Sequence, residues 1–71
     1  MSVEVAAPMK GKILEILVKV GDQASYEDEL MLLEAMKMEN PIYAPADGKV
    51  VEIRVAVGDT VEAEQVLLVL E

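Results

Sequence analysis

The chain has 71 residues, of which 14 are acidic and 6 are basic, and its formal net charge is −8. A chain this short forms one small domain that buries only roughly 60% of its unfolded surface, and the absence of cysteine and histidine removes disulfides, thiolate chemistry and the commonest metal ligand. The acidic balance argues against nucleic acid and anionic membranes as partners, so we expect no direct membrane contact. The absence of histidine argues against a metal site, and the absence of cysteine fits a cytoplasmic protein.

The first predicted element is a turn at residues 7–11, where Ala-Pro-x-x-Gly combines the preset φ of proline with a permissive glycine. A long strand follows this turn. Every second residue from Leu14 to Val20 is apolar and most are β-branched, which is the period of a half-buried strand. Gly21-Asp22 then predicts the turn that ends the strand.

The next apolar run, at residues 30–33, predicts a short strand that is buried on both faces. The segment 27–38 around it also contains residues that favour a helix. However, Val66 and Val69 occupy equivalent places in a second copy of the pattern, and Pro41 would end a helix soon afterwards. We therefore predict a strand rather than a helix.

The second half of the chain repeats these elements in the same order. A shift of 37 positions places residues 7–34 on residues 44–71 without a gap, so both kinds of turn and both apolar runs recur. We therefore predict a single domain over residues 1–71, built from two repeats at about 1–36 and 38–71 that share one core.

The two long strands break their alternation at the same place. Ile13 precedes Leu14 in the first repeat and Val50 precedes Val51 in the second, so that apolar residues become adjacent. This predicts a β-bulge or a partly covered outer face. Eight short strands in two symmetric halves then predict an all-β flattened barrel or sandwich.

The repeat also predicts where Lys37 lies. This lysine stands at the junction of the two copies, and the only other junction is the gap between residue 71 and residue 1. A two-fold axis that relates the copies exchanges these two junctions. We therefore expect Lys37 on a hairpin tip at one end of the molecule and both termini at the other end.

The residues around this junction carry a family resemblance. The chain resembles, over its whole length, the biotinyl domains of biotin carboxyl carrier proteins and of related carboxylases and decarboxylases. The most specific element is the attachment motif Ala35, Met36, Lys37 and Met38. The resemblance implies a barrel-sandwich hybrid of two four-stranded antiparallel sheets, with biotin joined to Lys37 by a biotin protein ligase.

The resemblance also implies a role. The chain would be a carrier subunit or domain without catalytic residues of its own. Its biotin would carry a carboxyl group between a biotin carboxylase and a carboxyltransferase or decarboxylase subunit. Two features depart from the family pattern. Glu27 and Glu64 stand where the family usually has a turn glycine, and the ungapped repeat leaves no room for the inserted "thumb" of some carriers, so the chain is of the thumbless kind.

The chemistry of Lys37 supports a modification site rather than an active site. A lysine ammonium is almost wholly protonated at neutral pH, and a nearby Glu34 or Glu39 would keep it so. Nothing in the neighbouring sequence can act as an internal base. Lys37 therefore needs an enzyme that deprotonates it and presents an activated acyl group.

Simpler interpretations compete at the neighbouring residues. Lys10 also follows a methionine, but it lies in the 7–11 turn and is expected to be structural. A Glu34–Glu39 carboxylate pair for glycoside hydrolysis has no aromatic cleft to support it. For the methionines, we expect one to pack on the tip and the other to give a soft contact to the ligase or to biotin.

Two alternative functions remain open. A lipoyl carrier of a 2-oxo acid dehydrogenase or glycine cleavage system would have the same fold, but such domains usually place aspartate before the lysine and alanine after it, where this chain has Met36 and Met38. An unmodified interaction domain would have no use for the Lys37 motif.

Overall fold

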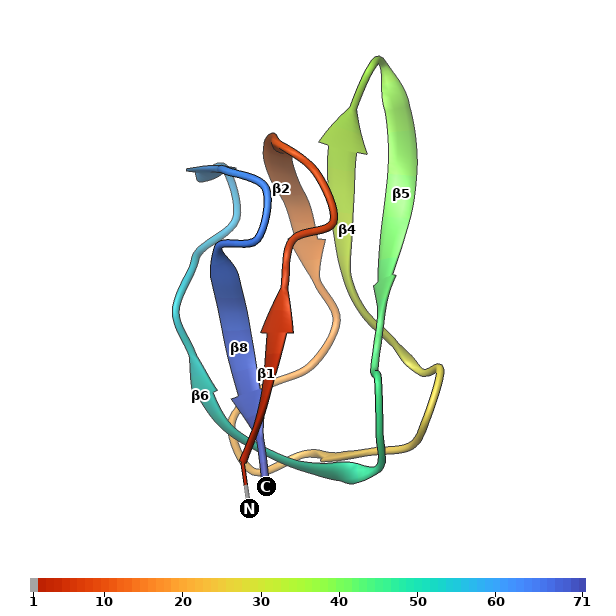
Figure 1. Ribbon diagram of the computed structural model, residues 1–71, viewed down its shortest axis with the longest axis vertical. Helices are drawn as coiled ribbons and strands as arrows, with labels where there is room; N and C mark the ends of the chain where they lie inside the picture. The colour runs from red at the N-terminus through yellow and green to blue at the C-terminus, as the bar shows by residue number, and fades with distance from the viewer. Residues whose placement is uncertain (1) are drawn as a thin grey trace.

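The computed structural model describes residues 2–71, which form eight strands in two antiparallel sheets of four (Figure 1). This confirms the all-β prediction. The strands are β1 (Val3–Ala6), β2 (Gly11–Ile16), β3 (Gln23–Ala24), β4 (Glu29–Ala35), β5 (Met38–Tyr43), β6 (Gly48–Ile53), β7 (Thr60–Val61) and β8 (Val66–Leu70). Their order is β1-β8-β6-β3 in one sheet and β5-β4-β2-β7 in the other.

The two sheets are related by the sequence repeat. A shift of 37 residues carries β2 onto β6 and β3 onto β7 residue for residue, and it carries β1 and β4 onto β5 and β8. The same shift converts one sheet order into the other. Each sheet contains strands from both repeats, so neither repeat has a complete sheet of its own. One core is therefore shared by both halves.

The core comes from the apolar runs that the sequence placed in β4 and β8. Leu67, Leu68 and Leu70 in β8 are fully buried, as are Leu30 and Leu33 in β4. Burying one such side chain contributes about 1.5–3 kcal/mol relative to leaving it exposed. A helix over 27–38 would have turned part of this run to solvent, and the strand prediction is confirmed.

Both predicted bulges are present, and they bury the residue that broke the alternation. The register shifts between Ile13 and Glu15 where β2 pairs with β4, and between Val50 and Glu52 where β6 pairs with β8. Ile13 and Val50 are fully buried as a result. The extra residue turns the strand so that its inward face changes.

The long strands end earlier than predicted. β2 ends at Ile16, and Val20 lies exposed beyond it. The reason is that the turn begins at Lys19 rather than at Gly21, since the Lys19 amide donates to Asp22 Oδ2 at 3.0 Å. The second repeat has the same error at Val57, where the Ala56 amide donates to Asp59 Oδ2. The aspartate of each Gly-Asp pair fixes a turn that starts before the glycine.

The turns that lack the family glycine keep a glycine-like backbone. Glu27 and Glu64 have φ values of 69° and 70°, in the left-handed region. The Glu27 amide donates to the Ala44 carbonyl at 2.9 Å and the Glu64 amide donates to the Ala7 carbonyl at 2.7 Å. These bonds hold the turns although a left-handed residue other than glycine costs about 1–2 kcal/mol. The departure therefore changes the residue and leaves the turn geometry glycine-like.

The molecule is elongated, with extents of 32 × 17 × 17 Å. The β4–β5 hairpin tip lies at one end of the long axis, and the start of β1 and the end of β8 lie together at the other end (Figure 1). This confirms the placement that the repeat predicted for Lys37. Among the described residues, no helix is long and apolar enough to cross a membrane.

Candidate functional site

The candidate site is the two-residue loop that joins β4 to β5. Ala35 pairs with Met38 at the end of the hairpin, which leaves Met36 and Lys37 as the loop. Their φ values are 55° and 63°. Two consecutive left-handed residues are the requirement of a type I′ turn, whose twist matches that of the flanking strands.

This loop is strained, because type I′ turns normally contain Asn-Gly or Gly-Gly. Each side chain in the left-handed region costs about 1–2 kcal/mol. The cost is borne by the hairpin below, in which β4 and β5 pair from Glu29 opposite Tyr43 to Ala35 opposite Met38. Strain of this kind persists where the surrounding structure over-determines the backbone, and it collects at functional sites. Lys37 thus has a strained, left-handed backbone at the tip.

The side chains of the tip extend into solvent. Met36 is 90% exposed and Met38 is 65% exposed, and Lys37 is exposed between them. The prediction that one methionine packs on the tip is therefore wrong. Ala35, immediately below the loop, is the last buried residue of β4, so the loop lies beyond the core that the methionines would need to reach.

Lys37 forms no ion pair within residues 2–71. The two ion pairs of this part of the chain join Lys10 to Glu62 and Arg54 to Glu52. Glu34 faces Glu39 directly across the hairpin, one step below the Ala35–Met38 pair. Neither carboxylate reaches Lys37, so the ammonium is free to extend outward.

The rival interpretations can be placed as well. Lys10 has its Nζ 3.8 Å from Glu62 Oε2, an exposed surface pair that contributes between 0 and about 1 kcal/mol. Glu34 also lies opposite Lys12 where β2 pairs with β4, which is a position in a sheet rather than in a site. The described residues contain no group of three or more metal-binding side chains.

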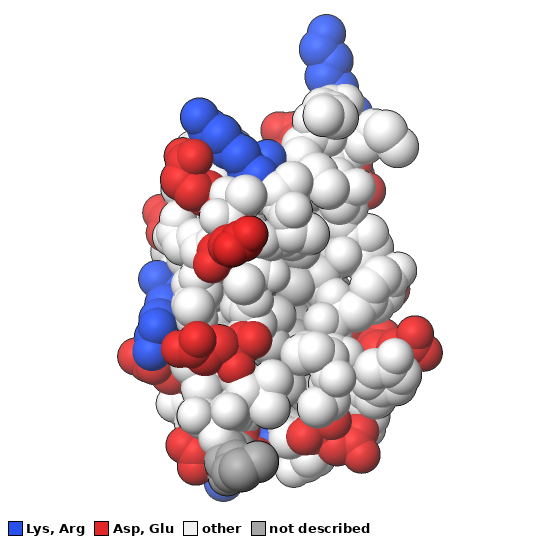
Figure 2. Space-filling model, viewed as in Figure 1, with Lys and Arg blue, Asp and Glu red and all other residues white. Residues whose placement is uncertain are grey.

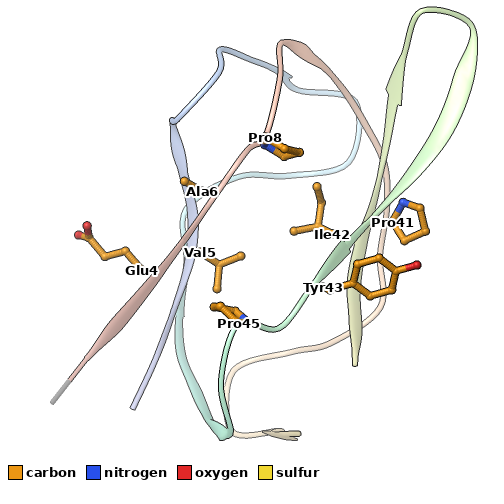
Figure 3. Close-up of a pocket in the computed structure, with 8 residues that line it drawn as sticks. All are labelled: Glu4, Val5, Ala6, Pro8, Pro41, Ile42, Tyr43 and Pro45. Atoms are coloured by element: carbon orange, nitrogen blue, oxygen red, sulfur yellow. The ribbon is translucent and has the colours of Figure 1, made fainter. Parts of the chain in front are cut away.

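Sequence reasoning missed an apolar groove of about 370 Å³ between β1 and β5 (Figure 3). Its eight lining residues form four pairs related by the 37-residue repeat, so the groove lies on the pseudo-two-fold axis: Glu4 and Pro41, Val5 and Ile42, Ala6 and Tyr43, Pro8 and Pro45. The 37-residue repeat was the sequence feature that could have indicated this groove. The groove forms because β1 and β5 are both edge strands and do not pair with each other.

Comparison with known proteins gives a consistent result. The model of the family described as "Biotin-requiring enzyme" matches residues 3–70. The chain is 58% identical over 41 residues to the glutaconyl-CoA decarboxylase subunit gamma of Acidaminococcus fermentans, a match that covers 58% of this chain and 28% of that protein. It is 64% identical over 36 residues to the biotin carboxyl carrier protein of Streptococcus mutans, with 51% and 28% covered.

A solved structure shares the whole fold. The urea carboxylase of Kluyveromyces lactis matches with a TM-score of 0.94 and 30% identity, over 100% of this chain and 6% of that one. The two curated relatives are likewise matched over little more than a quarter of their own length. This likeness confirms the predicted sandwich of two four-stranded sheets.

Proposed function

This chain belongs to the family of biotin-requiring enzymes, and from that premise we propose that it is a biotin carrier domain with biotin in amide linkage to Lys37. The observation that carries the proposal is the tip geometry. A strained two-residue loop with exposed side chains holds a primary amine that forms no ion pair within residues 2–71, at the end of the molecule opposite the start of β1 and the end of β8.

The residues present fit the attachment chemistry. Amide formation needs one accessible amine: Nζ of Lys37 would attack the carbonyl carbon of an activated biotinyl group, the activating group would leave, and the nitrogen would lose a proton. No carboxylate in residues 2–71 forms an ion pair with this amine, so the base would come from a biotin protein ligase. Once attached, biotin supplies the carboxyl-carrying chemistry.

The chain's own contribution is mechanical. The β4–β5 hairpin and the shared core make a rigid post, and tethering the cofactor to it raises its effective concentration at each partner site. We propose that the partners are a biotin carboxylase and a carboxyltransferase or decarboxylase subunit. Relatives named as a carrier protein and as decarboxylase subunits support a carrier without catalysis of its own. The same names favour biotin over a lipoyl group.

A cytoplasmic location remains a proposal that rests on the lack of cysteine.

Intact-mass measurement after co-expression with a biotin protein ligase tests the proposal. We expect one biotin increment in the wild-type chain and none in Lys37→Arg. Lys10→Arg, which alters the other lysine that follows a methionine, is the matched control and should keep the increment. A lipoyl increment, or biotin retained in Lys37→Arg, would contradict the proposal.

A further inference from the structure

The pseudo-two-fold symmetry relates two surface regions that have the same backbone structure, so their side chains can be compared directly. The turn before β4 packs beside the end of β5, and the turn before β8 packs in the same way beside the end of β1. The Ala44 amide donates to the Asp28 carbonyl at 2.8 Å, and the Ala7 amide donates to the Gln65 carbonyl at 2.9 Å. The backbones are equivalent, so differences between the side chains are not required by the fold.

We name the two regions by their residues. The Tyr corner consists of residues 26–29, 43 and 47, and the Ala corner consists of their repeat equivalents 63–66, 6 and 10. Tyr26 and Tyr43 are the only aromatic residues of the chain. They are 63% and 54% exposed. Their equivalents in the Ala corner are Ala63 and Ala6, which fold into the same backbone without an aromatic ring.

The two corners also differ in charge. The Tyr corner has four carboxylates, whereas the equivalent residues of the Ala corner carry one carboxylate and one ammonium: Glu27, Asp28, Glu29 and Asp47 correspond to Glu64, Gln65, Val66 and Lys10. The four carboxylates are exposed, and the two ion pairs found within residues 2–71 involve none of them. An unneutralised acidic cluster beside two exposed tyrosines therefore occurs on one side only.

The fold accounts for part of this acidity but does not require the charge. Asp28 Oδ2 accepts a hydrogen bond from the Ser25 amide at 2.8 Å. In the Ala corner, Gln65 Oε1 accepts the equivalent hydrogen bond from the Glu62 amide at 3.0 Å, and this side chain is uncharged. A neutral acceptor is therefore sufficient at this position of the turn. Asp47 Oδ1 accepts a hydrogen bond from the Tyr26 amide at 2.7 Å, whereas its equivalent Lys10 pairs with Glu62, so the Ala corner has the same backbone without that carboxylate.

The Tyr corner adjoins the apolar groove. Tyr43 and Pro41 line the groove on the β5 side (Figure 3). On the face shown in Figure 2, uncharged surface fills much of the middle, and acidic side chains lie at its lower right edge as well as along its left side. A ligand that crosses this edge would meet apolar surface on one side and carboxylates with tyrosine rings on the other.

We propose that the Tyr corner and the adjoining groove form a second docking surface, for an extended segment of a partner protein that combines arginine with aliphatic side chains. Arginine stacks on tyrosine rings and binds carboxylates in bidentate fashion, and an aliphatic side chain fits the groove. β5 is the edge strand of its sheet, so its outer side is open to an extended chain. The inference rests on the proposed function in one respect: the partner is an enzyme subunit that uses the carried group.

The position of this surface suits a carrier. Tyr43 lies six residues from Lys37 along β5, about 20 Å at the rise of an extended strand. A partner that docks at the Tyr corner would leave the tip unobstructed. It would also keep the attachment lysine at high local concentration beside the partner's own site.

A peptide titration of the ¹⁵N-labelled, biotinylated domain followed by NMR tests the surface. The probe is a ten-residue peptide that alternates arginine with valine, and its control has glutamine at each arginine. We expect saturable shifts at residues 26–29 and 41–47, weaker at high salt, and little change at residues 63–66. The glutamine peptide should bind at least about tenfold more weakly.

The matched variant is Tyr26→Ala/Tyr43→Ala, which installs the residues that the Ala corner already tolerates. It should weaken peptide binding about tenfold or more, as loss of aromatic hot spots does, while Val20→Ala/Val57→Ala should leave binding unchanged. Equal shifts at both corners, an unaffected tyrosine variant, or no binding at millimolar peptide would overturn the proposal. The biotin increment of each variant, measured by intact mass, reports separately on the proposed function.

Discussion

Glu27 and Glu64 lie 37 residues apart and adopt almost the same left-handed backbone, with φ values of 69° and 70°. Each amide donates to the carbonyl of a repeat-related alanine in the other half of the chain. The two turns therefore fasten the halves together through a conformation that glutamate disfavours. Both copies of the repeat therefore contain the same strained turn.

Replacing either glutamate by glycine should stabilise the domain. Glu27→Gly and Glu64→Gly remove left-handed strain of about 1–2 kcal/mol and add some chain entropy to the unfolded state, so the net gain is about 0.5–1 kcal/mol each. The two gains should add, because the turns are separate. Urea unfolding measures them. Ser25→Gly, in the same turn and outside the left-handed region, should destabilise, and glutamate variants that behave like it would contradict the strain.

A substitution at Met36 should raise the stability of the domain and lower its rate of biotin incorporation. Asparagine suits the first position of a type I′ turn, so Met36→Asn should raise the free energy of unfolding by roughly 0.5 kcal/mol or more. Biotin incorporation should fall, because Met36 is the most exposed methionine of the motif and is open to contact with a ligase. Thermal unfolding and the rate of biotin incorporation by purified ligase are the two measurements. A variant that loses stability and keeps its modification rate would show that Met36 has a structural role.

The contacts of the two strand-opening glycines predict unequal effects. A Cβ on Gly11 would collide with the backbone carbonyl oxygen of Glu34, which cannot move without disturbing the β2–β4 ladder. A Cβ on Gly48 would lie 3.1 Å from Leu70 Cβ and 3.2 Å from the backbone carbonyl oxygen of Glu71, which are tight contacts but less severe than the collision at Gly11. Gly11→Ala should therefore lower the free energy of unfolding by more than the roughly 1–3 kcal/mol that is typical of overpacking. Gly48→Ala should lower it by less than Gly11→Ala does. Equal losses in chemical denaturation would contradict this ranking.

The core should respond in repeat-related pairs. Leu33 and Leu70 are equivalent and fully buried, so Leu33→Ala and Leu70→Ala should each cost about 2–5 kcal/mol, which is a large part of the stability of so small a domain. Leu17→Ala is the exposed control and should cost less than about 1 kcal/mol. Circular dichroism on heating distinguishes them. A Leu70→Ala variant as stable as the control would show that the two halves do not share one core.

Much of the fold could be read from the sequence because the repeat constrains it. The equivalence of the two halves favoured strand over helix for β4, located both bulges and placed Lys37 opposite the termini. Single-residue geometry was less accessible. The turn at Lys19 starts early because of a hydrogen bond to the side chain of Asp22, and composition does not show this. Both methionines are exposed because the buried part of the hairpin ends at Ala35, and the sequence does not show where this burial ends.

The position of the candidate site could be predicted from the sequence, but its backbone conformation could not. The motif and the repeat junction identified Lys37, and the structure added the left-handed backbone that presents it. The Tyr corner was not predicted from the sequence. The meaning of its tyrosines depends on comparing them with Ala6 and Ala63, and that comparison requires knowing that the two corners share a backbone. Attachment of biotin at Lys37 stays a prediction.

Site-resolved mass spectrometry tests the central claim most directly. The chain is co-expressed with a biotin protein ligase, digested, and fragmented so that the modified residue is identified. We predict biotin on Lys37 alone, with the lysines at 10, 12, 19 and 49 unmodified. Biotin on any of those lysines in place of Lys37, or a chain that stays unmodified beside a ligase active on another carrier, would contradict the account.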